Sequence, residues 1–365
     1  MMLRKILGVM VIIAILTGTA SAQDTLMRQA DVFGTDNLQN GLSGEAENLM
    51  RGMDPLENTD PIKKALEIFK DALSGSGNVL KNAVTVMFRV LLIIVLCQIA
   101  DAFDQTKHTK AITMSGALGI VACCASDVHA MIGLGKSTMQ EISAFSDLLL
   151  PVMVSAATAS GSLTGAGAAY TLTVLFSNLL IRFANVVIIP AIYAFLALSL
   201  TDSVLQQTRL KHLRDLVGWF VENGLKAVVY LFIGALTITG LLSSAADSAA
   251  LKAAKFTMAG AIPVVGGIIS GAASTVLSGA ALLKSTIGTF GMLAVLAVFV
   301  TPFIHMGVSF LVFKVTTAIG GILNAEQSSL LEGLSSVMGY LLAMVSSCAL
   351  IALLSCCSMI RTVQA

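Results

Sequence analysis

Charged residues are scarce in this sequence, and their scarcity limits the classes of protein to which it can belong. Asp, Glu, Lys and Arg make up 12% of its 365 residues, whereas hydrophobic residues make up 56%. Because soluble domains carry about 25% charged residues, this chain has too little polar surface for a water-soluble particle. A net charge of +1 and the lack of a dominant basic patch argue against nucleic-acid binding. The composition therefore predicts a chain that lies mostly in a lipid bilayer.

Residues suited to metal or covalent chemistry are also few. The six cysteines all fall in apolar runs: Cys97, Cys123, Cys124, Cys348, Cys356 and Cys357. The adjacent cysteine pairs lack the spacing of zinc ligands. Residues 23–82 contain no cysteine, so they hold no disulfide framework. No Ser/His/Asp or Cys/His set stands out. We therefore expect no metal site, no cofactor and no enzymatic activity.

A nucleotide-binding loop is suggested by Gly135-Lys136-Ser137-Thr138, but the pattern is incomplete. The full phosphate-binding motif requires a glycine five residues before Gly135, where this chain has Ala130. The preceding run also resembles a membrane span rather than a strand. We therefore expect no nucleotide to bind this chain.

The first 22 residues have the layout of a secretory signal peptide. Arg4 and Lys5 precede the apolar run Ile6–Leu16, and Ala20-Ser21-Ala22 forms a small-residue cleavage site. The apolar core is too short for a permanent span. An uncleaved anchor is the alternative, and in both cases we expect the segment from Gln23 onward to lie on the extracytoplasmic side.

Residues 23–82 form an acidic segment with one amphipathic helix. Ten acidic and six basic side chains give it a net charge of −4. Asp60 followed by Pro61 is a favourable helix start. The apolar residues that follow at helical spacing are Ile62, Leu66, Phe69 and Leu73. An isolated stripe of this kind requires a covering surface, and both an extracytoplasmic protein partner and the membrane surface fit it.

Beyond residue 82 the sequence predicts an all-α polytopic membrane protein. Six segments approach the roughly 20 apolar residues that cross a bilayer. They are Ala83–Phe103, Ala111–Leu134, Thr171–Leu198, Gly224–Ala246, Ile287–Val312 and Ser335–Met359. The first two fill a unit of residues 83–135. Two further apolar stretches, Leu150–Tyr170 and Ala261–Leu283, are crowded with small residues, and we expect them to form re-entrant hairpins.

A constant offset of 112 residues indicates an internal duplication. It relates Pro151 to Pro263 and Pro190 to Pro302, and it superposes two of the predicted spans. The predicted repeat units are residues 145–247 and 257–359. Paired segments interrupted by glycine and proline are typical of transport pathways, although chance similarity remains an alternative.

The basic loops predict the orientation of the spans. The loop that carries Arg209, Lys211, His212 and Arg214 is expected in the cytoplasm by the positive-inside rule. This holds if Leu150–Tyr170 is re-entrant and fails if it crosses fully.

Polar residues inside the spans are the candidate functional sites. Arg182 shares a helical face with Asn178 and Asn185, and arginine at a helix centre costs about 2.5–3.5 kcal/mol to insert. This stripe of polar side chains could face a water-filled path. Alternatively, its role is structural, and the Arg182 side chain bonds to carbonyl groups of a neighbouring hairpin or extends to the membrane interface. Thr301 and His305, beside Pro302, form a weaker candidate. The candidate pathway or packing residues are Arg89, Pro151, Asn178, Arg182, Asn185, Pro263, Gly266, Gly267 and Gly271.

The chain as a whole resembles the stage III sporulation protein AE family. The resemblance is carried by a signal peptide, an acidic exported segment with a helix from Asp60, and a small-residue run. That run reads Ala261-Ile262-Pro263-Val264-Val265-Gly266-Gly267 and continues from Ser270 to Gly279. The resemblance covers nearly the whole sequence, but it rests on no catalytic signature.

The resemblance implies a subunit of the channel that links mother cell and forespore in an endospore-forming bacterium. Members lie in the mother-cell-derived outer forespore membrane and support late forespore gene expression. The implied partners are the other stage III channel subunits and, through them, a forespore-side protein. The conduit role would be permease-like or that of a scaffold. The alternative is an independent secondary transporter for a small, anionic solute that contacts Arg182.

Overall fold

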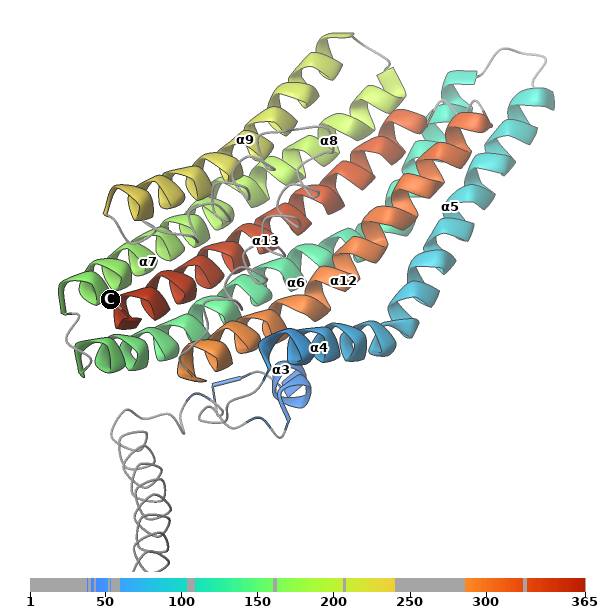
Figure 1. The fold of residues 1–365 in the computed structure, drawn as a ribbon. Coiled ribbons are helices and arrows are strands. Elements are labelled where there is room, and N and C mark those ends of the chain that lie inside the picture. Colours follow the sequence, from blue (N-terminus) through green and yellow to red (C-terminus); the bar gives the residue numbers. More distant parts are fainter. Residues whose placement is uncertain are drawn as a thin grey trace, which may run out of the picture.

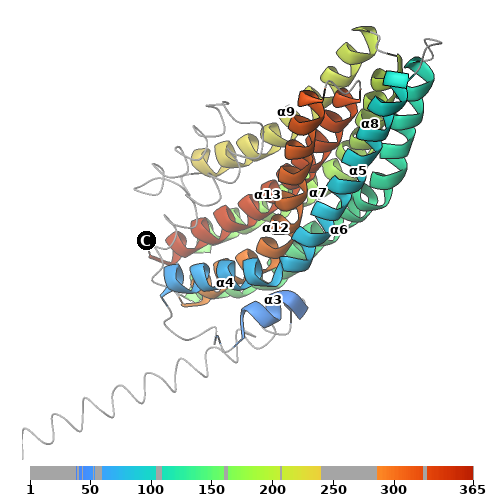
Figure 2. The same ribbon diagram turned by 90° about the vertical axis from the view of Figure 1, so that its right-hand side faces the viewer.

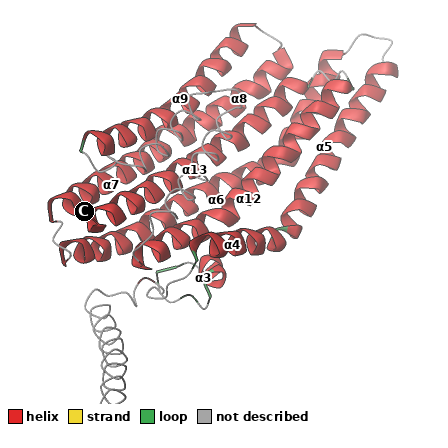
Figure 3. Cartoon of the chain, viewed as in Figure 1, coloured by secondary structure: helices red, strands yellow, loops and turns green. Residues whose placement is uncertain are grey.

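The computed structural model describes most of the chain beyond the predicted signal peptide, and the described part is α-helical with no strand (Figure 3). The described residues are 38, 41–42, 44–51, 53, 60–103, 109–159, 163–205, 208–239, 286–323 and 327–364. Six helices are long and apolar enough to cross a membrane. The predicted all-α polytopic class is therefore confirmed. Residues 1–22 and Ala261–Leu283, including Pro263, Gly266, Gly267 and Gly271, lie outside the described residues.

Before the long helices, the described residues include α3 (Gly44–Leu49) and α4 (Pro61–Gly75). The helix start predicted at Asp60 is present, because its carboxylate accepts hydrogen bonds from the backbone N–H groups of Ile62 (3.1 Å) and Lys63 (3.4 Å). α4 ends at Ser76, whose N–H donates to the Leu73 carbonyl at 3.2 Å. The next helix begins one residue later.

The long helices form one bundle with α13 at its centre (Figures 1 and 2). In chain order they are α5 (Gly77–Phe103), α6 (Thr109–Ala159), α7 (Leu163–Phe183), the π-helix η1 (Ala184–Ile188), α8 (Ile189–Leu205), α9 (Thr208–Ile238), α12 (Thr286–Ile322) and α13 (Ser328–Gln364). Helices α12, α6, α7, α8 and α9 all contact α13. In the most apolar stretch of α13, 94% of the residues are buried, against 11% in α5. α13 is thus the core, and α5 lies at the edge.

The structure corrects the prediction of a re-entrant hairpin at Leu150–Tyr170. Its first half is the end of α6, which continues through Pro151 to Ala159, and its second half begins α7. The described residues of this segment therefore belong to two long helices and not to a separate hairpin. Pro151 itself is exposed, but Leu149, Leu150, Val152 and Met153 beside it are buried in the bundle, and this packing on both sides allows the helix to continue past the single lost hydrogen bond.

The course of α6 and α7 bears on the predicted orientation, because Leu150–Tyr170 does not cross as a span of its own. α7 runs back along α6, and α9 begins at the end of the bundle where α5 ends (Figure 1). Arg209 and Lys211 at the start of α9 therefore lie at the same end as Lys110 at the start of α6. Two basic segments at one end are typical of the cytoplasmic side.

A buried ion pair joins α8 to α9 at this end. Nη1 of Arg214 lies 3.0 Å from Oδ2 of Asp202, and the two side chains are 8% and 9% exposed. Arg214 also contacts the more exposed Asp215 at 3.1 Å. Elsewhere, Thr173 of α7 donates to Ser355 of α13 at 2.8 Å in the core. Polar contacts as well as apolar packing therefore hold the outer helices on the bundle.

Candidate functional site: two cavities that meet at His305

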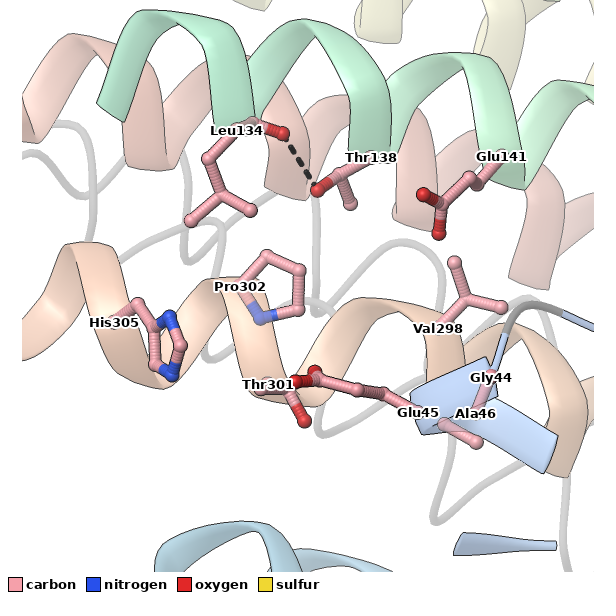
Figure 4. A pocket seen from close by; sticks show the side chains of 11 residues that line it. Gly44, Glu45, Ala46, Leu134, Thr138, Glu141, Val298, Thr301, Pro302 and His305 are labelled. Atoms are coloured by element: carbon pink, nitrogen blue, oxygen red, sulfur yellow. Dashed lines mark hydrogen bonds between the residues drawn. The ribbon is translucent and has the colours of Figure 1, made fainter. Parts of the chain in front are cut away.

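The larger of the two cavities has a volume of about 300 Å³ and lies between α3, α6 and α12 (Figure 4). Its polar lining comes from three separate parts of the chain: Glu45, Thr138, Glu141, Thr301 and His305. The remaining lining residues are Gly44, Ala46, Leu134, Ala297, Val298 and Pro302. Helix α3 thus closes a polar space against the long helices.

Pro302 leaves one backbone acceptor of α12 without its usual helical donor, next to this cavity. Proline has no N–H, so the carbonyl four residues earlier, at Val298, receives no bond from it. Val298 and Pro302 lie on α12 opposite Leu134 and Thr138 of α6 (Figure 4). The Thr138 hydroxyl does not fill the gap, because it donates to the Leu134 carbonyl at 2.8 Å. A freed carbonyl beside a cavity is available to a water, a proton donor or a cation.

A second cavity of about 160 Å³ lies between α5, α6, α12 and α13. Its polar lining consists of Asn82, Asp127, His305 and Ser309, and the apolar remainder is Val79, Ala83, Val86, Met131, Val312, Phe313 and Met338. The Ser309 hydroxyl donates to the His305 carbonyl at 3.0 Å. His305 lines both cavities and therefore stands between them.

Acidic side chains dominate the charge around His305. Glu45 of α3 interacts electrostatically with His305, and Arg89 of α5 interacts with Asp127 of α6. Together with Glu141, the three carboxylates outnumber the one arginine. Carboxylates concentrate positive charge and repel anions, so the pair of cavities suits a proton or a small cation. The part of the chain that the structure describes holds no group of three or more metal-binding side chains.

The predicted polar stripe lies on the outer surface of α7 and η1. Asn178 and Arg182 are exposed and Asn185 is partly exposed. Asn178 donates to the Val174 carbonyl at 2.9 Å, and Asn185 donates to the Ile181 carbonyl at 3.0 Å. The stripe therefore lines neither described cavity and faces lipid or another subunit.

Helix length explains why Arg182 can lie on the outer surface. The sequence places it near the centre of a single span, but α7, η1 and α8 run on as one helix from residue 163 to 205. At 1.5 Å per residue this run is about 64 Å long, roughly twice the thickness of the hydrocarbon core. The centre of the helix therefore does not mark the centre of the bilayer, and Arg182 has no need of a buried partner.

The other candidate residues are placed in three different settings. Arg89 is exposed on α5 but acts on Asp127, at the rim of the smaller cavity. Pro151 is exposed within α6 and lines neither cavity. The stripe of α4 is exposed throughout its length: Ile62, Leu66, Phe69 and Leu73. Only Arg89 therefore belongs to the neighbourhood of the cavities.

Sequence reasoning identified part of this site and missed its acidic residues. Thr301 and His305 were recognised as a polar pair beside Pro302. Glu45, Asp127 and Glu141 were not connected with them, because they come from α3 and α6, far away in sequence. A signal was present in α6, where Asp127 and Glu141 interrupt an apolar run of more than one bilayer width.

Comparisons with known proteins identify the relatives of this chain. A family model described as "Stage III sporulation protein AE (spore_III_AE)" matches residues 43–362. A curated protein, "Stage III sporulation protein AE" of Bacillus subtilis (strain 168), is 22% identical over 235 residues. That match covers 64% of this chain and 59% of the relative, so the matched region spans about three fifths of the relative's length. No solved structure matches.

Proposed function

Because this chain belongs to the stage III sporulation protein AE family, we propose that it is a membrane subunit of the complex that connects mother cell and forespore. In this proposal it lies in the mother-cell-derived outer forespore membrane and supports late forespore gene expression. Its partners are the other stage III subunits and, through them, a forespore-side protein. Family membership itself indicates a role in sporulation.

The filled centre of the bundle indicates what kind of subunit this chain is. α13 occupies the axis, and 94% of its most apolar stretch is buried. The cavities beside it, of about 300 and 160 Å³, have room for a few water molecules or a small ion. A conduit for larger molecules through the described helices would need α13 to leave its place. We therefore propose that this chain acts as a wall or scaffold and that any wide conduit forms between subunits.

The duplication remains part of the proposal. Both proposed repeats contain a helical hairpin with a proline in its first arm: Pro190 before α9, and Pro302 before α13. The surroundings differ, since the π-helix η1 precedes Pro190 while α12 is α-helical through Pro302. Pro302 alone of the two lines a described cavity.

A secondary transporter is the second candidate, and the polar cavity beside Pro302 favours it. Proline-containing segments next to a polar site are typical of solute sites in transporters. Glu45, Glu141 and Asp127 suit a proton or cation rather than the anionic solute inferred from Arg182. Ion flux into vesicles that contain the purified chain alone supports this candidate. Sporulation without such flux supports the subunit.

We expect changes at Pro302 and His305 to impair sporulation while the protein still folds. Pro302→Ala restores an N–H to the Val298 carbonyl, a hydrogen bond worth about 1 kcal/mol, so the protein gains stability as the cavity wall closes. His305→Leu removes the polar group shared by both cavities. In a spore-forming host that carries this chain in place of its own family member, each change should lower heat-resistant spore counts by roughly tenfold or more.

Matched controls separate these effects from general damage. Pro151→Ala changes a proline within α6, and His129→Leu changes an exposed histidine of α6; neither lines a cavity. Both should sporulate normally at equal protein levels. If Pro302→Ala and His305→Leu both sporulate normally, the cavities have no role in sporulation. Failure of the chain to co-purify with other stage III subunits would overturn the subunit proposal itself.

The proposed orientation has its own test. In non-sporulating cells that carry the chain in the plasma membrane, with its six cysteines replaced by alanine, Lys211→Cys at the start of α9 should resist a membrane-impermeant maleimide while the cells are intact. It should react after the membrane is permeabilised. Lys63→Cys in α4 is the control, and it should react in intact cells. Reaction of Lys211→Cys in intact cells contradicts the cytoplasmic position of the basic end.

A further inference from the structure

Helix α4 has two apolar faces, and only one of them is used within the chain. Ile68 and Ala72 are buried, at 0% and 6% exposed, where α4 packs on α12. The second face is a stripe whose side chains are 46–65% exposed: Ile62, Leu66, Phe69 and Leu73. Four large apolar side chains in one row on an otherwise charged helix require a covering surface.

Lysines border the stripe on the side away from α12. At 100° per residue, Lys63 and Lys70 lie about 70–90° from the centre of the stripe, whereas Ile68 and Ala72 lie on its other side. Glu67 follows further round, and it pairs with Lys64 at 3.0 Å. The order around the helix is therefore packing face, apolar stripe, lysine edge and acidic face.

This order is that of a helix lying in a membrane interface. Such helices sink an apolar face into the acyl boundary, while lysines at its edge extend toward the phosphates. A protein groove gives no reason for lysines along one edge only, with the acids held away from the stripe. Charge complementarity thus favours anionic lipid.

The position of α4 in the fold also favours contact with the membrane surface. Only Ser76 separates it from α5, which is 11% buried in its most apolar stretch and is therefore the most lipid-accessible of the long helices. Large apolar side chains such as Leu80, Phe88 and Leu92 are exposed along α5. Figure 2 shows α4 turning away from the direction of α5 at this junction. The exposed apolar surface of α5 thus continues onto α4 where the chain enters the bilayer.

We propose that α4 is an interfacial lipid-binding helix, with the stripe in the acyl boundary and Lys63 and Lys70 on anionic phospholipid headgroups. Bound in this way, α4 fixes the depth of the bundle in the bilayer. Through Ile68 and Ala72 it also fixes the position of α12, which carries Pro302 and His305. The cavities thus acquire a fixed height relative to the membrane surface.

Tryptophan quenching in vesicles tests this proposal, because the chain has a single tryptophan, Trp219. In a Trp219→Phe background, Phe69→Trp places a probe in the stripe and Glu67→Trp places one on the acidic face. Each full-length variant is reconstituted with dibrominated phosphatidylcholine and phosphatidylglycerol. Quenching at position 69 should be several-fold stronger than at position 67. Equal quenching at the two positions, or weak quenching at 69, overturns the proposal and favours a protein partner.

The lysine edge is tested in the same vesicles. Lys63→Glu with Lys70→Glu should reduce quenching at position 69 several-fold. Lys63→Glu alone should reduce this quenching in part, whereas Lys64→Glu, a single reversal of charge on the opposite side, should have little effect. If the double change leaves quenching at position 69 intact, the headgroup contact is wrong. None of these readouts depends on sporulation, so they are independent of the proposed channel role.

Discussion

Replacement of Arg214 by methionine is expected to destabilise the bundle by about 3–5 kcal/mol, because it leaves a buried carboxylate without its counter-ion. Asp202, the residue left behind, is 9% exposed and lies 3.0 Å from the guanidinium. The lost pair also joins α8 to α9, so the damage should open that hairpin first.

Asp202→Asn is expected to cost less than Arg214→Met. The guanidinium keeps Asp215 at 3.1 Å, a carboxylate that is 53% exposed, and the new amide oxygen can still accept a hydrogen bond. Comparing the two variants therefore gives the difference in free energy between leaving Asp202 without a partner and leaving Arg214 with Asp215 as its partner.

Unfolding of the purified chain in mixed micelles, titrated with a denaturing detergent and followed by circular dichroism, measures both changes. Glu67→Gln is the control, because it breaks the exposed Lys64–Glu67 pair of α4 and such pairs contribute roughly 0–1 kcal/mol. If Arg214→Met destabilises the chain no more than Glu67→Gln, the ion pair does not hold the hairpin.

The sequence predicted the helices well, because their signals are local. Long apolar runs identified the spans, and Asp60 before Pro61 identified the start of α4 at the observed residue. The exposed stripe of α4 was also predicted, from spacing alone. Its packing face was not, because Ile68 and Ala72 acquire their meaning only from contact with α12.

Features that depend on tertiary contacts or on helix length could not be predicted from the sequence. The exposed position of Arg182 was not evident, because no local signal shows that α7 and α8 form one helix longer than a span. The cavities at His305 require α3 and α12, whose lining residues Glu45 and His305 are 260 positions apart in the chain. Thr301 and His305 were recognised because they are neighbours on one helix.

Close packing of α8 against α13 leads to a second large effect, at Gly333. This glycine lies where a Cβ atom would stand 2.5 Å from Cβ of Ser199 and closer still to its hydroxyl. Ser199 is fully buried, and its hydroxyl donates to the Phe195 carbonyl at 2.8 Å. Because Cβ of Ser199 is fixed to the backbone, a side chain at position 333 must push the two helices apart.

Gly333→Ala should therefore destabilise the chain by about 1–3 kcal/mol, the usual cost of overpacking, in the same detergent titration. Gly307→Ala is the matched control in α12, since nothing lies within 4 Å of its added methyl group. This control should gain up to about 1 kcal/mol, because alanine favours the helix over glycine. Ser199→Gly removes the clashing atoms, so the double variant should recover most of the loss, with a coupling energy of about 0.5–3 kcal/mol. Equal effects at Gly333 and Gly307, or no recovery in the double variant, would contradict the close approach of α8 to α13.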